Sequence, residues 1–109
     1  MASFEFKEED GEDFEKFLKD HKDAPTFVDF NATWCGPCRA LKPQLKKICE
    51  DNKFNFVSVD VDENPDLSEK YGVQGIPFVI LFKNGEKVHE FTGNKPEAIN
   101  EAVEVAKKN

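Results

Sequence analysis

Long apolar runs are missing from this sequence. No stretch approaches the roughly 18 consecutive apolar residues that a membrane-spanning helix needs. Residues 1–10 contain neither the basic segment nor the apolar segment of a secretory signal peptide. We therefore expect a cytoplasmic protein that makes no contact with membranes.

Positive charge is also in deficit. The chain has 15 Lys and Arg residues against 22 Asp and Glu residues, which gives a formal net charge of −7 at pH 7. A chain of this sign repels phosphate backbones and anionic lipids. We therefore expect no nucleic acid among the partners, and we expect most of the charges to form an ordinary solvated surface.

Cysteine is scarce as well, with three residues among 109. So few cysteines argue against the structural disulfide framework of a small secreted domain. Two of the three, Cys35 and Cys38, are nevertheless separated by only two residues. The function of this close pair in a reducing compartment is the main question that the sequence raises.

The remaining composition is typical of a folded globule. Hydrophobic residues make up 39% of the chain and include 11 Phe, whereas disordered chains are poor in aromatic residues. A chain of this length buries roughly two thirds of its unfolded surface, which suffices for one core without metal or disulfide staples. We expect a single domain over residues 1–109.

Strand-like and helix-like segments alternate along the chain. Strands are expected at residues 3–7, 26–31, 54–61, 78–82 and 86–92. Helices are expected at residues 10–22, with Asp10 as the cap, at 35–52, with an interruption at Pro43, at 64–72 and at 95–108.

The order of these segments predicts an α/β fold. Asn84-Gly85 is a strong signal for a type I′ hairpin, so the last two strands should be antiparallel. The earlier alternation favours a central mixed sheet of four to five strands with about four helices on its two faces. Reactive sites of such sheets lie beyond the carboxyl ends of the strands. The cysteine pair follows the strand at 26–31 and should lie at that edge.

Cys35 and Cys38 have the spacing of neighbours on one helix face. Positions i and i+3 have Cβ atoms about 5–6 Å apart, and a disulfide needs Cα atoms roughly 4.4–6.8 Å apart. Cys35 lies at the expected helix start, where unpaired N–H groups and the helix dipole favour a thiolate. Cys35 should therefore attack a substrate disulfide, and the less exposed Cys38 should then attack Cys35 to release the reduced product.

The residues between the cysteines suit this chemistry. Gly36 lets a partner chain approach closely, and Pro37 lies in the first helical turn, where its missing N–H removes a donor that has no intrahelical partner. Two alternatives stay open. One is a zinc site that would also draw on Cys49, His21 and His89, and the other is a purely structural role for the pair.

Cys49 falls on the apolar stripe of the same expected helix, together with Leu41, Leu45 and Ile48. It follows Cys38 by 11 residues, which is about 16 Å along a helix axis and beyond the reach of a disulfide. We interpret Cys49 as a small core residue, with a regulatory thiol as the alternative.

Asp29 lies in a β-rich segment with aromatic neighbours on both sides. A carboxylate in such a place loses solvation, which raises its pKa and suits it to accept the proton of Cys38. An Asp that is hydrogen-bonded in the sheet for structure alone is the alternative interpretation.

Four segments of the chain form a recognisable set. They are residues 27–38, which end in Trp34-Cys35-Gly36-Pro37-Cys38, residues 59–65, residues 71–77, and residues 81–85 with Gly93 beyond them. In content and order these segments resemble the thioredoxin family. The resemblance implies a thioredoxin fold with the dithiol at a helix start, and it matches Asp29 to the buried acid of the family.

The resemblance also implies a substrate-binding surface around the dithiol. It places a cis peptide bond between Ile76 and Pro77, packed against the disulfide, with an ordinary strand-entry proline as the alternative. An extended substrate segment would pair with the backbone before Pro77. Trp34 would lie beside the dithiol, with core packing as the alternative. The residues expected at this surface are Trp34, Gly36, Pro37, Val61, Gly75, Ile76, Pro77, Thr92 and Gly93.

Three positions depart from the family pattern. Asn31 stands where many bacterial relatives have Trp, and Ser58 stands where a charged residue lies near the buried acid. Phe78 follows the expected cis-proline, where Thr is usual. The first two departures bear on the tuning of Asp29 and the dithiol, and the third bears on how substrates dock.

By resemblance, the expected function is general protein-disulfide reduction. The dithiol would pass two electrons to partner disulfides, and an NADPH-dependent thioredoxin reductase would restore it. The implied clients are peroxiredoxins, methionine sulfoxide reductases and ribonucleotide reductase. We expect a monomer without a bound cofactor or metal. The alternatives are a redox-controlled binding module without turnover, and a disulfide oxidase or isomerase with a more oxidising dithiol.

Overall fold

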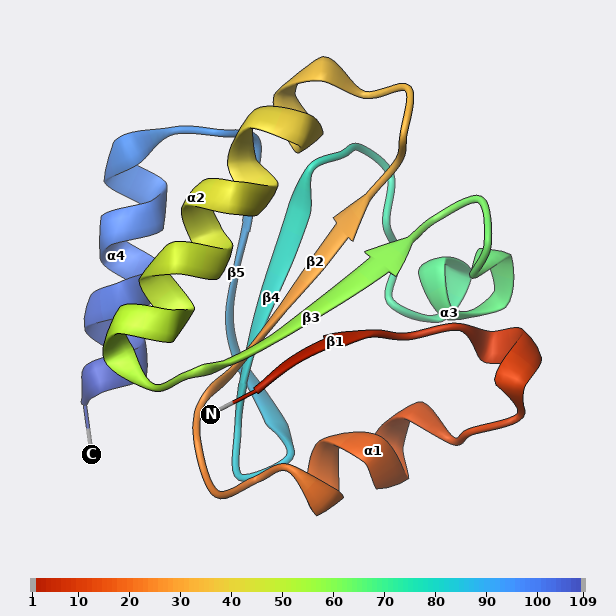
Figure 1. The fold of residues 1–109 in the computed structure, drawn as a ribbon, viewed down its shortest axis with the longest axis horizontal. Coiled ribbons are helices and arrows are strands. Elements are labelled where there is room, and N and C mark those ends of the chain that lie inside the picture. Colours follow the sequence, from red (N-terminus) through yellow and green to blue (C-terminus); the bar gives the residue numbers. More distant parts are fainter. Residues whose placement is uncertain (1, 109) are drawn as a thin grey trace.

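The computed structural model describes residues 2–108, in which five strands form one sheet with helices on both faces (Figure 1). The strands are β1 (Ser3–Glu5), β2 (Thr26–Asn31), β3 (Asn55–Asp60), β4 (Phe78–Lys83) and β5 (Glu86–Thr92). The helices are α1 (Phe14–Asp20), α2 (Gly36–Asn52), α3 (Pro65–Lys70) and α4 (Pro96–Lys107), with one 3₁₀ turn at Glu8–Asp10. Within residues 2–108, no helix is both long and apolar enough to cross a membrane.

The strand order across the sheet is β1-β3-β2-β4-β5. β1, β3 and β2 run parallel to one another, whereas β4 is antiparallel to β2 and β5 is antiparallel to β4. Asn84 and Gly85 join β4 to β5 with φ values of 57° and 82°, and a type I′ turn requires positive φ at both positions. The expected mixed sheet and its final hairpin are therefore confirmed.

The sheet separates two apolar cores. Alternate residues of the central strands point to opposite faces, so in β2 Val28 and Phe30 belong to one core and Phe27 to the other. The first core is closed by α1 and α3 through Phe14, Phe17, Leu18 and Leu67. The second core is closed by α2 and α4, which lie together in Figure 1, through Leu41, Leu45, Cys49, Ile99, Ala102 and Ala106.

The first helix starts later than the sequence predicts. Gly11 has a φ of 79° and ends the 3₁₀ turn that contains Asp10. The cap of α1 is Asp13, whose Oδ1 accepts a hydrogen bond from the backbone N–H of Glu15 at 2.9 Å. The prediction of Asp10 as the cap was wrong because a left-handed residue separates Asp10 from the helix.

The expected interruption of α2 at Pro43 is also wrong. The helix runs from Gly36 to Asn52 with Pro43 inside it. Proline removes one backbone hydrogen bond from a helix and disturbs the preceding turn. Leu41 and Leu45, on either side of Pro43, are both fully buried against the sheet, and this packing holds the helix together across the proline.

Segments that lie far apart in the sequence meet at the edge of the sheet where β2 and β3 end. The backbone N–H of Val61 donates to the carbonyl of Asn31 at 2.8 Å, and that of Gly93 donates to the carbonyl of Pro77 at 2.8 Å. Because β4 is antiparallel to β2, its beginning lies at the same edge as the end of β2. This edge carries the functional site.

Candidate dithiol active site

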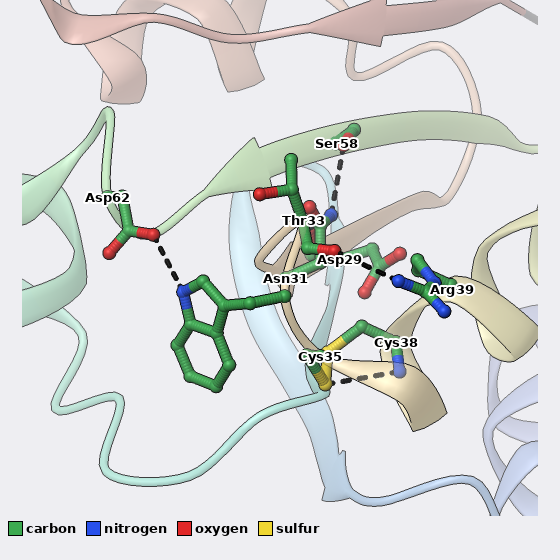
Figure 2. Close-up of a disulfide and its surroundings, with 9 residues drawn as sticks. Asp29, Asn31, Thr33, Cys35, Cys38, Arg39, Ser58 and Asp62 are labelled. Carbon is green, nitrogen blue, oxygen red and sulfur yellow. Dashed lines mark hydrogen bonds between the residues drawn. A yellow bond between two sulfur atoms is a disulfide. The ribbon is translucent and has the colours of Figure 1, made fainter.

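Cys35 and Cys38 form a disulfide at the N-terminus of α2, with their Cα atoms 5.2 Å apart (Figure 2). Cys35 is the N-cap residue, and its Sγ accepts a hydrogen bond from the backbone N–H of Cys38 at 3.2 Å. The exposed fraction is 6% for Cys35 and 1% for Cys38. The expected helix-start position of the pair and the greater exposure of Cys35 are both confirmed.

The first turn of α2 is arranged to stabilise negative charge on Cys35. Pro37 contributes no N–H to this turn, so the N–H of Cys38 points at the sulfur of Cys35. The positive end of the helix dipole adds to this effect. Gly36 and Pro37 are exposed beside the disulfide, so a partner chain has access to the sulfur of Cys35.

Asp29 lies on β2 and is completely buried. Within residues 2–108, neither of its carboxylate oxygens has a hydrogen-bond partner. Burial raises the pKa of Asp29 to about 7, while the positive charge of Lys42 and, to a smaller extent, Asn31 act to lower it. The sequence predicts both the burial of this carboxyl group and the rise in its pKa.

Asn31 and Ser58 form a hydrogen-bonded pair beside Asp29. The Nδ2 of Asn31 donates to the backbone carbonyl of Asp29 at 2.9 Å and to the Oγ of Ser58 at 3.0 Å. Because Asn31 donates to these two atoms, the carboxylate oxygens of Asp29 have no hydrogen-bond partner within residues 2–108. We therefore assign the raised pKa of Asp29 to desolvation rather than to hydrogen bonding. The sequence singled out both positions, but it did not predict that their side chains contact each other.

A cavity of about 180 Å³ opens beside Cys38. It lies between the end of β2 and the first turns of α2, and it is lined by Asn31, Ala32, Thr33, Cys38, Arg39 and Lys42. Sequence reasoning missed Lys42 as a site residue. The available signal was its position four residues after Cys38, one helical turn along the same helix.

A second hollow, of about 170 Å³, is lined by Trp34, Val61, Ser68, Val73, Gln74, Gly75 and Ile76. Trp34 is 68% exposed, so the alternative that it packs in the core is wrong. The indole Nε1 of Trp34 donates to Oδ2 of Asp62 at 2.9 Å (Figure 2). Val61 and Ile76 also pack against the disulfide.

The remaining residues of the expected surface lie nearby. The peptide bond between Ile76 and Pro77 is cis, as the family resemblance implies. Thr92 is exposed at the end of β5, and Gly93 is bonded to Pro77. Phe78 is different, because it is buried and its ring lies 6.0 Å from that of Phe30. Its side chain therefore belongs to the core, and the expected influence on substrate docking is not a direct contact.

Cys49 is a buried free thiol in the core between α2 and the sheet. Burial raises the pKa of its thiol to about 12, and the nearby charge of Asp29 adds to the rise. Its expected place on the core face of the helix is confirmed. Within residues 2–108, no three His, Cys, Asp or Glu side chains are grouped so that they could hold a metal ion.

Comparison with known proteins agrees with this geometry. The family model for thioredoxin matches residues 5–105. Thioredoxin-2 of Pyricularia oryzae is 46% identical over 86 residues, which make up 78% of this chain and 49% of that protein. The chain spans between 49% and 59% of the length of the fungal and mammalian mitochondrial relatives that it matches.

Solved structures show the same fold. Reduced Schistosoma mansoni thioredoxin pre-protein has a TM-score of 0.83 and 36% identity, over 98% of this chain and 97% of that one. A chain from a structure on thiol resolution in yeast mitochondrial 1-Cys peroxiredoxin by the glutathione and thioredoxin systems has a TM-score of 0.75 and 31% identity, over 84% and 86% of the two chains. The present chain belongs to the thioredoxin family.

Proposed function

We propose that the protein is a general protein-disulfide reductase in which Cys35 and Cys38 pass two electrons to disulfides of partner proteins. The observation that carries this proposal is the disulfide at the start of α2, where the N–H of Cys38 points at the sulfur of Cys35. A dithiol in this position closes and opens without moving the helix, because its Cα atoms are 5.2 Å apart.

The first step uses Cys35 of the reduced protein as the nucleophile. Its thiolate attacks one sulfur of the substrate disulfide, so that a mixed disulfide forms and the other substrate sulfur leaves as a thiolate. The N–H of Cys38 and the end of the helix dipole stabilise the attacking thiolate before the reaction.

The second step releases the substrate. Cys38 gives its proton to the carboxylate of Asp29, directly or through water in the adjoining cavity, and its thiolate attacks the sulfur of Cys35. The disulfide between Cys35 and Cys38 forms, and the second substrate sulfur leaves as a thiolate. Two electrons have then passed from the dithiol to the substrate. A pKa near 7 suits Asp29 to accept and return this proton at neutral pH.

The substrate segment would lie in the hollow between Trp34 and Ile76. Gly75 is exposed and Ile76 half-buried in the loop before β4, so their backbone groups can pair with an extended segment. Trp34 and Val61 offer apolar surface to its side chains. This arrangement favours recognition of extended backbone over recognition of one particular side chain, in keeping with a reductase that serves several clients.

Recycling by an NADPH-dependent thioredoxin reductase is part of the proposal, as are peroxiredoxins, methionine sulfoxide reductases and ribonucleotide reductase as clients. Support for a peroxiredoxin client comes from the yeast structure named above, whose subject is thiol resolution in a peroxiredoxin. The cytoplasmic location stays a prediction. Two of the relatives are mitochondrial thioredoxins, which makes a mitochondrial location the alternative.

Reduction of insulin by dithiothreitol tests the activity. The protein should accelerate the appearance of turbidity over the uncatalysed reaction, and the matched control that carries Cys35→Ser and Cys38→Ser together should not. If the unmodified protein gives no acceleration, it is not a disulfide reductase, and a redox-controlled binding module becomes the better interpretation. Oxidation of NADPH in the presence of purified thioredoxin reductase, with insulin as the acceptor, then tests the recycling step.

A further inference from the structure

Three side chains form one row across the sheet, on the face that α2 covers. The strand register pairs Glu5 of β1 with Ser58 of β3, and pairs Ser58 with Asp29 of β2. Side chains paired in this way on parallel strands point to the same face. Phe27 and Phe56, two residues before Asp29 and Ser58, pack in the core beneath α2, so the row lies beneath α2 as well.

The row has a carboxylate at each end. Glu5 lies at the open edge of the sheet with its side chain 68% exposed, whereas Asp29 is completely buried. Two strand spacings separate them, which is roughly 10 Å. Ser58 lies between them, and its Oγ accepts a hydrogen bond from Asn31. Because Ser58 is uncharged, the row itself brings no positive charge to either carboxylate.

Lys42 lies over this row. It is on α2, one turn after Cys38, and it lines the cavity together with Cys38 and Asn31. Its ammonium group lies 3.4 Å from Oε1 of Glu5, and its side chain is 37% exposed. The same positive charge acts on Asp29 at the other end of the row. Lys42 therefore contacts the exposed carboxylate and acts through its charge on the buried one.

We propose that Lys42 is a positioning residue of the dithiol site, whose ammonium group stabilises the carboxylate form of Asp29. While Asp29 is protonated, the ammonium group of Lys42 pairs with Glu5 at the edge of the sheet. This inference rests on the proposed function, because it concerns the group that receives the proton of Cys38. In this role Lys42 acts on the reaction through Asp29.

The balance between the two carboxylates supports this role. An ion pair between side chains as exposed as those of Lys42 and Glu5 contributes little to stability, so the ammonium group is only loosely held. Asp29 without its proton is a buried charge whose oxygens are unpaired within residues 2–108, and such a charge strongly favours a nearby cation. When Cys38 delivers its proton, the carboxylate is neutralised and Lys42 returns to Glu5.

Other groups around Asp29 do not replace Lys42 in this role. Arg39 lines the same cavity, but its Nη1 lies 3.5 Å from the carbonyl of Thr33. The thiol of Cys49 stays neutral because its pKa is raised to about 12. On the side of β4, the residue that pairs with Asp29 is the apolar Val79.

Titration of the Asp29 carboxyl carbon by NMR, in the oxidised full-length protein, tests the proposal without any need for turnover. Lys42→Gln should raise the pKa of Asp29 by roughly 0.5–1 unit, because it removes the attracting charge. Lys42→Arg should restore most of the original value. Glu5→Gln should lower the pKa of Asp29, because it releases Lys42 from its exposed partner. The matched control is Lys46→Gln, one turn further along α2 and exposed.

A rate measurement follows from the same logic. At pH 7, Lys42→Gln should slow release of the substrate from the mixed disulfide by about two- to fivefold, because less Asp29 is in its carboxylate form. An unchanged titration of Asp29 in Lys42→Gln, or an equal shift in Lys46→Gln, overturns the proposal. A failure of the unmodified protein to reduce insulin overturns the proposed function instead, and the titration distinguishes the two outcomes.

Discussion

The indole Nε1 of Trp34 donates a hydrogen bond to Oδ2 of Asp62 at 2.9 Å. Trp34 precedes the dithiol and Asp62 follows the end of β3, so the bond connects two segments that lie 28 residues apart in the chain. The Trp34 ring is 68% exposed, so packing alone does little to restrict its orientation. The bond to Asp62 orients the ring at the rim of the hollow beside the disulfide.

Asp62→Ala should weaken the docking of substrate without affecting the chemistry. Loss of one hydrogen bond to an exposed ring corresponds to about 0.5–1 kcal/mol, or roughly a two- to fivefold rise in KM for a protein disulfide, with kcat unchanged. Steady-state reduction of insulin at several concentrations measures both constants. Glu69→Gln removes an exposed negative charge on α3 and is the control. An equal rise in KM for both variants would assign the effect to charge rather than to the orientation of Trp34.

The two cysteines should differ in what they trap. Cys38→Ser leaves Cys35 able to attack but removes the thiol that resolves the mixed disulfide, so covalent adducts with disulfide substrates should accumulate. Cys35→Ser should trap none, because Cys38 is only 1% exposed. Mass spectrometry after reaction with a disulfide-containing peptide distinguishes the two results. Normal turnover by Cys35→Ser would mean that the nucleophile has been assigned wrongly.

The burial of Asp29 should make stability depend on pH. The folded protein keeps the proton of Asp29 up to about pH 7, whereas the unfolded chain releases it near the ordinary value of 3.8. The folded state therefore binds more protons between these two values, and the free energy of unfolding falls as pH rises through this window. The loss reaches at most roughly 4 kcal/mol and is constant above the upper value.

Asp29→Asn has no proton to lose in either state. The oxidised variant should be more stable than the oxidised parent protein by roughly 2–4 kcal/mol at pH 8, and the difference should shrink toward zero near pH 4. Urea unfolding at a series of pH values measures it. Asp66→Asn, at an exposed position on α3, should give a small change that does not vary over this range. A gain for Asp29→Asn that is the same at pH 4 and pH 8 would exclude the ionisation of Asp29 as its cause.

Much of the fold could be predicted because its signals are local. Residues Thr26–Asn31 form a strand with the expected bounds, since four of the six residues after Pro25 are β-branched or aromatic. The geometry of the Asn84-Gly85 turn is determined by these two residues alone, because both readily adopt the positive φ that the turn requires. The spacing of Cys35 and Cys38 likewise needs nothing beyond one helical turn.

The errors and omissions arise where distant segments decide the outcome. Pro43 stays inside α2 because Leu41 and Leu45 are anchored on the sheet, which no local pattern reports. The pair formed by Asn31 and Ser58 depends on the register between β2 and β3. The place of Lys42 in the cavity beside Cys38 depends additionally on how α2 crosses the sheet, so it became visible only with the structure.

Asn64 connects three parts of the chain and should be important for stability. It is completely buried between β3 and α3. Its Oδ1 accepts from the backbone N–H of Glu8 at 2.7 Å, and its Nδ2 donates to the carbonyls of Phe6 at 3.1 Å and Asp60 at 2.9 Å. The side chain thus joins the segment that follows β1 to the end of β3.

Asn64→Ala should destabilise the protein by roughly 2–4 kcal/mol, because one backbone N–H and two carbonyls lose their partner at once. Asn64→Asp should also destabilise it, since a carboxylate accepts the Glu8 N–H but cannot donate to the two carbonyls. Asn52→Ala, which removes a single bond from Nδ2 to the carbonyl of Ile48 at the end of α2, should cost under about 1 kcal/mol. Urea unfolding of the oxidised proteins compares the three variants.

The melting temperatures give a second measurement. Because the melting temperature of a domain of this size changes by roughly 4–8 °C per kcal/mol, the difference between Asn64→Ala and Asn52→Ala should also be clear there. Equal losses for the two alanine variants would mean that the bonds of Asn64 do not act together as an anchor between β1 and α3.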